Sequence, residues 1–494
     1  MISFIFFTLL LIVGYLIYGK ITEKVFVIKP DTQTVAYRLQ DGVDYVPMPQ
    51  WKTLLIQLLN IAGTGPIFGA IAGALFGPAA FAWIVFGCVL AGSVHDYMVG
   101  MLSMRNDGAN ISEIVGKYLG QGPRYIMRVF SVVLLIFVGV VFVYTPAQVL
   151  RTMFAPDSLR FYHVTVAVII AYYILATMLP IDKIIGRIYP LFGVCLLVMA
   201  VGLTLMLFVS GEIKHVPEFS FVNMRPDKDT NIVAKLFPFL FITIACGAIS
   251  GFHATQSPLM ARCLKNEKEG RSVFFLAMIL EGIIAMIWAA VTMAHFNYVG
   301  VEAAVSAPVV VTKSSVDLMG WVGGVLAVFG VVAAPITSGD TAFRSARLTI
   351  ADIFKLDQKP IKNRLFVALP LFAVGIALLM FSISSTANFN IIWRYFAWSN
   401  QTLATIGLWA ASAYLAKTSK NYWITLIPAT FMTSVITSYF FTANECLGPM
   451  VTAITGNMNI TYTIGLCIGI GLAVVLFFLF IPLIGIKQKG MLKD

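Results

Sequence analysis

Charged residues are scarce in this sequence. Asp, Glu, Lys and Arg make up 12% of the 494 residues, whereas 59% are hydrophobic and the mean hydropathy is +0.87. A soluble protein has too little interior to bury so much apolar surface. The composition therefore excludes a soluble protein and predicts one that lies in a lipid bilayer. The net charge of +11 arises from loops between apolar segments, so it does not indicate nucleic-acid binding.

Cysteine is also rare, and the motifs of common enzymes are missing. The six cysteines show neither paired metal-binding spacing nor a disulfide framework, and we interpret most of them as small apolar residues inside the protein. The sequence contains no HExxH, GxSxG or Walker motif and no soluble segment that would hold a cofactor. We therefore predict no catalytic residues, no cofactor and no metal site apart from a coupling ion.

Long apolar segments dominate the chain. About thirteen of them are long enough to cross a bilayer, at 2–19, 51–77, 79–104, 124–149, 162–179, 188–210, 235–261, 272–296, 321–343, 364–384, 388–416, 422–442 and 461–485. The first has no basic residues before it and no cleavage site after it, so we expect a membrane helix rather than a removable signal peptide. The sequence predicts an all-α polytopic membrane protein.

The positive residues are distributed unequally about these segments. Of the 34 Lys and Arg residues, 26 fall on one side of the predicted membrane, seven on the other, and Arg394 within a span. The positive-inside rule places the richer side in the cytoplasm. The amino terminus is then outside and the carboxyl terminus inside.

Two of the predicted spans contain residues that interrupt a helix. NIAGTGPIFG (60–69) lies in the second span and CGAISGFHATQSP (246–258) in the seventh. Backbone groups left unpaired in lipid cost several kcal/mol each, so such breaks persist only where they line a polar cavity. The glycines at 65, 69, 73 and 77 also suit close helix packing, but packing does not account for Gly63, Thr64 or Pro66.

The two breaks occupy matching places in the chain. Spans two to six and spans seven to eleven each open with a broken helix, and the two sets run in opposite directions, which is typical of an inverted-repeat transporter. We predict a five-plus-five core with one extra helix before it and two after it. The expected units are 1–50, an N-terminal helix and cytoplasmic segment; 51–210 and 211–416, the two repeats; and 417–494, two C-terminal helices. The stretch 112–120 is expected to be an amphipathic surface helix, and the outer loop 297–320 either a lid or a surface helix.

The breaks offer groups that bind a solute. Pro66 suits the first turn of a helix, so the second half of span two should begin at about Gly65, and its free N–H groups would bind a carboxylate. Hydroxyl, amide and imidazole groups follow in spans seven and eleven. The predicted substrate-binding residues are Gly63, Thr64, Gly65, Ser250, Gly251, His253, Gln256, Asn400 and Gln401.

Ionisable residues inside predicted spans are candidates for coupling, because burying them is costly. We assign proton coupling to His95, Asp96 and Glu281; static ion pairing is the alternative, and we favour it for Asp340 with Arg344. Arg394 enters span eleven from the outer side and is interpreted as an outer gate, or equally as a residue that snorkels from an aromatic belt.

Several long motifs resemble the carbon starvation protein A family: DGVDYVP (41–47), NIAGTGPIFGAIAGALFGP (60–78), HDYMVGMLSMRNDGANISEIVGKYLG (95–120), PITSGDTAFRSARLTIADIF (335–354) and WRYFAWSNQTLA (393–404). The resemblance implies a transporter of the bacterial inner membrane with a leucine-transporter-like fold, associated with uptake of pyruvate or peptides during carbon starvation. It also implies a possible sodium site in which Thr337 and Ser338 face the backbone carbonyls of Ala62 and Gly65.

We predict a secondary symporter for a small carboxylate, with pyruvate ahead of amino acids and peptides. Protons are the expected coupling ion, with Na⁺ as the alternative. The expected partners are the small-molecule substrate and the lipid bilayer, without nucleic acid; the oligomeric state stays open. A nutrient sensor that no longer transports is compatible with the same pocket.

Overall fold

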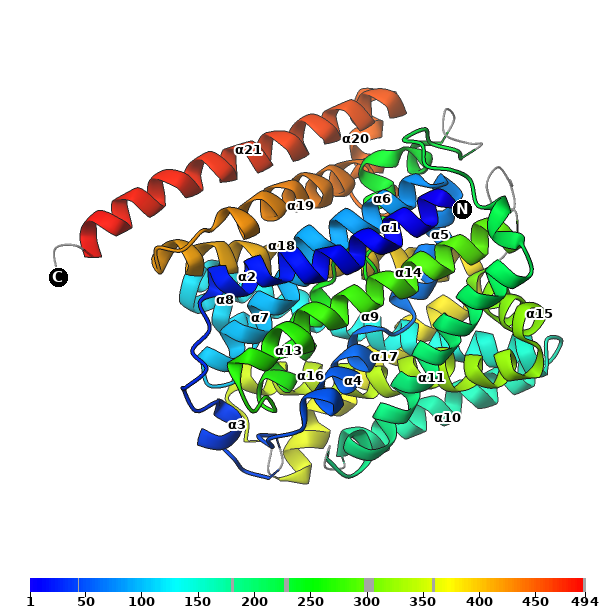
Figure 1. Cartoon of the computed structure of the whole chain (residues 1–494), viewed down its shortest axis with the longest axis horizontal. Helices are drawn as coiled ribbons and strands as arrows, with labels where there is room; N and C mark the ends of the chain where they lie inside the picture. The colour runs from blue at the N-terminus through cyan, green and yellow to red at the C-terminus, as the bar shows by residue number, and fades with distance from the viewer. Residues whose placement is uncertain (43, 179–181, 226–230, 297–305, 358–359, 492–494) are drawn as a thin grey trace.

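Every regular element is helical in the part of the chain that the structure describes. The computed structural model describes residues 1–494 except 43, 179–181, 226–230, 297–305, 358–359 and 492–494. In Figure 1, α19 and α21 run side by side along one edge of the helical body, whereas α10 and α11 lie at the opposite edge.

The first half of the chain begins with a long helix and contains the first break. Its helices are α1 (Ile2–Val13), α2 (Gly19–Phe26), α3 (Val35–Arg38), α4 (Gln50–Ile61), α5 (Gly65–Gly73), α6 (Ala79–Phe86), α7 (Ser93–Arg105), α8 (Ile111–Leu119), α9 (Gln121–Phe154), α10 (Leu159–Met178) and α11 (Asp182–Val209). A π-helical turn joins α1 to α2, and another joins α6 to α7. The predicted helix at 112–120 is observed as α8, with one face buried in the protein; its place on the membrane surface stays a prediction.

The second half contains α12 (Phe241–Thr243), α13 (Gly251–Ala261), α14 (Leu276–His295), α15 (Ala307–Ala327), α16 (Ala333–Phe354), α17 (Ile361–Ser384), α18 (Thr386–Lys417), α19 (Trp423–Thr442), α20 (Gly448–Thr455) and α21 (Met458–Met491). The first part of the predicted outer loop, 297–305, lies outside the described residues. Its second part is helical and belongs to α15, which begins at Ala307. Helix α15 bends at Gly320, whose φ of 63° is one that glycine adopts readily.

Ten helices among the described residues are long and apolar enough to cross a membrane, or eleven when α4 and α5 count as one bent span. The seventh and eleventh predicted spans are not among them. Both carry polar residues such as His253 and Asn400, which are buried within the protein rather than facing lipid. The prediction of a multi-span helical protein is confirmed, while the count of thirteen and the inverted repeat stay predictions.

Both predicted helix breaks are confirmed. Helix α4 ends at Ile61 and α5 begins at Gly65 with Pro66 in its first turn, and the two axes differ in direction by 51°. Helix α12 ends at Thr243, and α13 begins at Gly251 after an extended Ser250. The chain is therefore non-helical at both places where glycine, proline and small polar residues gather.

The two breaks also lie against each other. A Cβ atom added to Gly65 would lie 2.3 Å from the Cys246 sulfur, and one added to Gly69 would lie 3.1 Å from the Thr243 carbonyl oxygen. Only glycine permits this approach of α5 to the second break. The glycine-rich segment thus both ends α4 and lets α5 pack closely against the second break.

Candidate functional site

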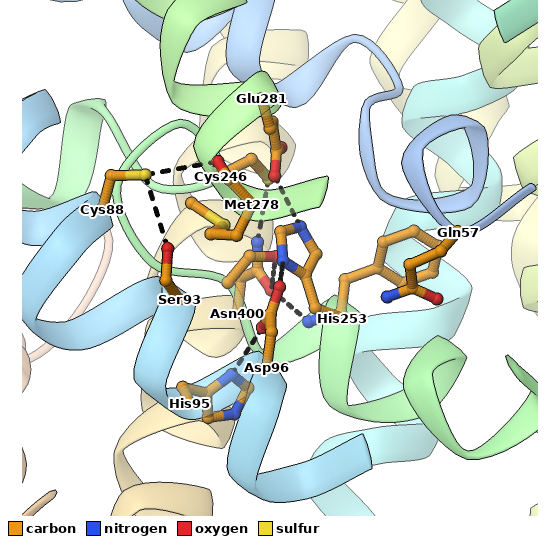
Figure 2. Close-up of polar contacts among 12 residues, drawn as sticks. Gln57, Cys88, Ser93, His95, Asp96, Cys246, His253, Met278, Glu281 and Asn400 are labelled. Carbon is orange, nitrogen blue, oxygen red and sulfur yellow. Dashed lines mark hydrogen bonds and ion pairs between the residues drawn. The ribbon is translucent and has the colours of Figure 1, made fainter. Parts of the chain in front are cut away.

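Three helices bring four titratable side chains together beside the second break. His95 and Asp96 come from α7, His253 from the first turn of α13, and Glu281 from α14, and all four are fully buried. Figure 2 shows the His253 ring between the two carboxylates. The residues predicted for proton coupling therefore lie together, and His253, predicted to bind substrate, joins them. We call these four residues the histidine–carboxylate cluster.

Asp96 is the central acceptor of this cluster. Its Oδ1 lies 2.8 Å from His95 Nδ1 and its Oδ2 lies 2.7 Å from His253 Nδ1. Hydrogen bonds to an ionised group are roughly twice as strong as neutral ones. Asp96 therefore links α7 to α13 directly behind the break.

Glu281 is held much less firmly. Its Oε2 lies 3.2 Å from His253 Nε2, within ion-pair distance, but the two groups are not aligned as a hydrogen bond. Neither carboxylate oxygen accepts a hydrogen bond from any described residue. Because an unpaired buried charge costs several kcal/mol, Glu281 is the group of the cluster whose ionised form is least compensated.

The position of His253 between two acids has a consequence for protons. A neutral imidazole has one N–H donor and one acceptor nitrogen. Both of its nitrogens face carboxylate oxygens here, so either the ring carries a second proton or one carboxylic acid is protonated. The cluster can thus hold a proton that moves between His253 and Glu281.

Asn400 and Gln401 bind the second break itself. Asn400 Oδ1 accepts hydrogen bonds from the Phe252 N–H at 2.6 Å and from the Ser250 hydroxyl at 3.1 Å. Gln401 Nε2 donates to the Phe241 carbonyl oxygen at 2.6 Å. These side chains, predicted to contact substrate, therefore hold the N-terminus of α13 and the first residue of α12 in this structure.

The first break is closely surrounded by protein. Gly63, Thr64 and Gly65 are buried, and the Thr145 hydroxyl lies 3.4 Å from the Thr64 hydroxyl. A Cβ atom added to Gly63 would lie 2.5 Å from the Phe142 ring. The predicted substrate residues of this break therefore meet Phe142 and the second break, while Gly251 packs against α18.

The predicted cation site has different partners from those expected. The Ser338 hydroxyl donates to the Leu59 carbonyl oxygen at 3.0 Å, one turn before Ala62, and the Thr337 hydroxyl donates within its own helix to Ala334 at 2.7 Å. Ser338 thus reaches the end of α4 but through another carbonyl. Within the described residues, no group of three or more His, Cys, Asp or Glu is arranged to hold a metal ion.

Cavities approach this region from two sides. On the side predicted to be cytoplasmic, a cavity of about 160 Å³ reaches Thr255 of α13, whose hydroxyl accepts a hydrogen bond from the Gln256 amide at 2.9 Å. On the side predicted to be outer, adjoining cavities of about 230 and about 420 Å³ are lined by residues of α5 and α18. The cluster lines none of these three cavities, and the cavity on the predicted cytoplasmic side comes within two residues of His253, at Thr255.

Arg394, the predicted outer gate, lines the cavity of about 230 Å³. Its Nη1 lies 3.2 Å from Oε2 of Glu445, a residue between α19 and α20. Sequence reasoning did not identify Glu445. The sequence offers only a weak signal for Glu445, because a single acidic residue after a membrane span usually contacts solvent. Asp340 accepts a hydrogen bond from the Tyr172 hydroxyl, and Arg344 donates one to the Ala176 carbonyl; the pairing of Asp340 with Arg344 stays a prediction.

Comparison with known structures shows the fold. The chain superimposes on a manganese transporter of Eremococcus coleocola with a TM-score of 0.52 at 14% sequence identity, covering 89% of this chain and 99% of that protein. At such low identity the likeness concerns the arrangement of helices alone.

Sequence comparison identifies closer relatives. A Haemophilus influenzae protein described as an uncharacterized membrane protein is 48% identical, covering 60% of this chain and 92% of the relative. A Bacillus subtilis protein named peptide transporter CstA is 26% identical, covering 89% of this chain and 90% of the relative. The Escherichia coli pyruvate/proton symporter BtsT is 28% identical, covering 56% of this chain and 46% of the relative.

The sequence pattern of one family matches nearly the whole chain. That family is described as carbon starvation protein CstA, and its pattern matches residues 1–155, 146–322 and 309–439. These matches include both helix breaks, all four residues of the histidine–carboxylate cluster, and Arg394. The chain belongs to the carbon starvation protein CstA family.

Proposed function

We propose that the protein is a secondary active symporter that imports a small carboxylate, pyruvate first, across the bacterial inner membrane together with a proton. The chain is a transporter and not an enzyme, as its named relatives are transporters. The coupling ion, the substrate and the orientation in the membrane are the parts of this proposal that experiment must decide.

The histidine–carboxylate cluster carries the proposal for protons. His253 lies two residues after α13 begins at Gly251, and it faces both Asp96 and Glu281. A proton that binds Glu281 or leaves it changes the charge directly behind the second break. Because charge in a low-dielectric interior interacts strongly with its surroundings, proton binding is coupled to the conformation of the segment that lines the proposed substrate site.

The first break supports a carboxylate substrate. Helix α5 begins at Gly65 in the interior of the protein, where its first N–H groups and the positive end of its dipole favour an anion. Closure around Gly63 by Phe142 fits a state in which the site is shut. Opening would separate these groups and admit the solute.

A peptide is the second candidate, and one observation favours it. Glu281 accepts no hydrogen bond from the described residues, so it could also pair with the ammonium group of a peptide. The relatives include proteins named for peptides and one named for pyruvate. The Glu281 carboxylate would then bind either the proton or the ammonium group of the substrate.

Uptake into proteoliposomes tests the proposal. A proton gradient directed inward, with the outside acidic, should drive labelled pyruvate to a higher concentration inside than outside. Replacing Na⁺ with K⁺ should leave this uptake unchanged. Competition by unlabelled dipeptides would favour the peptide alternative. Loss of uptake without Na⁺ would implicate the Ser338 region. Binding of pyruvate, seen as thermal stabilisation, without any uptake would instead indicate a sensor.

A further inference from the structure

The two cavities on the side predicted to be outer form one hollow. They share the lining residues Ala72, Leu75, Asn390 and Trp393. We call the combined space the outer vestibule. Phe68 of α5 also lines it, three residues after Gly65, and its ring centre lies 6.0 Å from that of Trp393. The vestibule therefore ends against the helix that begins at the first break.

The charge of this lining has one sign. Arg225 and Arg394 line the cavity of about 230 Å³, Arg151 lines the cavity of about 420 Å³, and no Asp or Glu is among the described lining residues of either. Clefts lined by charge of one sign concentrate ligands of the opposite sign and speed their association. Three arginines in the lining of the vestibule therefore favour anions over cations there.

The Arg394 guanidinium group contacts Glu445 at one edge, and its other N–H groups can still bind a solute. Only its Nη1 contacts an acid, Glu445, at 3.2 Å, and its other N–H groups donate to no described residue. The Arg394 side chain is 39% exposed, whereas that of Glu445 is 3% exposed. A guanidinium group has five N–H donors, so it can bind Glu445 at one edge and a solute carboxylate at another.

Glu445 is fixed by two tyrosines. The Tyr439 hydroxyl donates to the Glu445 carboxylate, and the Tyr395 hydroxyl donates to the Glu445 backbone carbonyl. Tyr439 lies in the last turn of α19, and Tyr395 lies in α18, next to Arg394. The segment between α19 and α20 therefore determines the direction of the Arg394 side chain.

We propose that the outer vestibule is an entry site for small carboxylates, in which Arg394 binds the carboxylate group and Glu445 acts as its positioning residue. Arg225 and Arg151 supply further positive charge. This inference rests on the proposed function and deepens it, since it gives the C-terminal helices a role in substrate recognition. The solute would bind here before the breaks open.

Uptake kinetics test the role of Glu445. Arg394→Gln should raise the KM for pyruvate about tenfold or more, with a maximal rate within about twofold of wild type. Glu445→Gln should raise the KM similarly, because the guanidinium group loses its fixed direction, and Arg394→Lys should not rescue binding, since an ammonium group lacks the planar fork. Arg160→Gln is the matched control, because Arg160 is an exposed arginine at the start of α10 and is not among the vestibule's lining residues. Equal KM values in all four variants would overturn the proposal.

A measurement without transport separates this inference from the proposed function. Trp393 fluorescence, taken as the difference between wild type and Trp393→Phe, should be quenched more by iodide, an anion, than by neutral acrylamide. Arg394→Gln and Arg225→Gln should reduce iodide quenching about twofold or more and leave acrylamide quenching unchanged. Iodide quenching that is insensitive to both changes would contradict an anion-selective vestibule. Arginine-dependent quenching in a protein that imports no pyruvate would support the vestibule and refute the proposed function.

Discussion

Replacing Glu281 by glutamine gives the sharpest test of proton coupling. The change keeps the shape of the side chain and removes its ability to bind and release a proton. Glu281 accepts no hydrogen bond from the described residues, so the amide breaks none of the described hydrogen bonds. The variant should therefore fold with a melting temperature close to that of wild type, because it loses only one ion-pair contact of 3.2 Å with His253 and no described hydrogen bond.

The expected effect on pyruvate accumulation follows from one proton moving with each pyruvate. One proton moving with one pyruvate anion is electrically neutral, so the pH gradient alone drives accumulation. One pH unit corresponds to about 1.4 kcal/mol, or about a tenfold concentration ratio. With a gradient of one unit, wild type should accumulate pyruvate about tenfold. Glu281→Gln should approach a ratio of about one.

The assay compares net uptake with exchange in the same vesicles. Net uptake of labelled pyruvate is measured under an imposed pH gradient, and exchange of external labelled for internal unlabelled pyruvate is measured without a gradient. The variant should lose gradient-driven accumulation and retain exchange, because exchange needs no net proton movement. Accumulation at the wild-type ratio would refute Glu281 as the proton carrier. Loss of both activities together with a lower melting temperature would show that its role is structural.

Asp96→Asn provides the contrast. Asp96 binds His95 at 2.8 Å and His253 at 2.7 Å, so the amide leaves two imidazoles without their common anion. Removing one partner of a buried charged pair costs about 3–5 kcal/mol. This variant should show a clearly lower melting temperature, unlike Glu281→Gln. Similar melting temperatures for the two variants would mean that the cluster is not held together by Asp96.

Two further changes test the packing of the breaks and the charge of Lys420, on the side predicted to be cytoplasmic. Gly65→Ala should abolish uptake and destabilise the protein by about 1–3 kcal/mol, because the new Cβ would lie 2.3 Å from the Cys246 sulfur. Cys246→Gly in the same chain should restore uptake. Gly122→Ala is the control, because nothing lies within 4 Å of a Cβ at that position. Uptake unaffected by Gly65→Ala would show that the breaks do not meet as described. Burial, together with the nearby charge of Arg105, lowers the pKa of Lys420 from 10.5 to about 8. Between these values the unfolded chain binds the proton and the folded chain does not, so stability should rise from pH 8 to 10. Lys420→Gln should lack this part of the rise in melting temperature.

The helix breaks were predictable because their cause is local. Proline cannot donate a backbone hydrogen bond and fits the first turn of a helix, and glycine weakens the helix before it. From Gly63 and Pro66 alone, the end of α4 and the start of α5 follow within a residue or two. The apolar spans were predictable for a similar reason, since their length is set by the bilayer and not by the fold.

The partners of the polar side chains were not predictable in this way. Sequence reasoning assigned Asp96 to the proton path and His253 to the substrate, yet the two residues, 157 positions apart, form one hydrogen bond. It expected Ser338 at Ala62, whereas the hydroxyl binds Leu59. Which atoms meet depends on the rotation of each helix about its own axis, and a rotation of one residue moves a side chain through about 100°.

What the sequence determined by itself is thus that the chain is a multi-span helical protein, where its helices break and which residues are costly to bury. Only the tertiary structure decided that His253 stands between Asp96 and Glu281 and that Glu445 contacts Arg394. The physical reason is that backbone hydrogen bonding and the length of an apolar span depend on residues that are neighbours in the sequence. The neighbours of a buried side chain, by contrast, are chosen by close packing between helices from distant parts of the sequence.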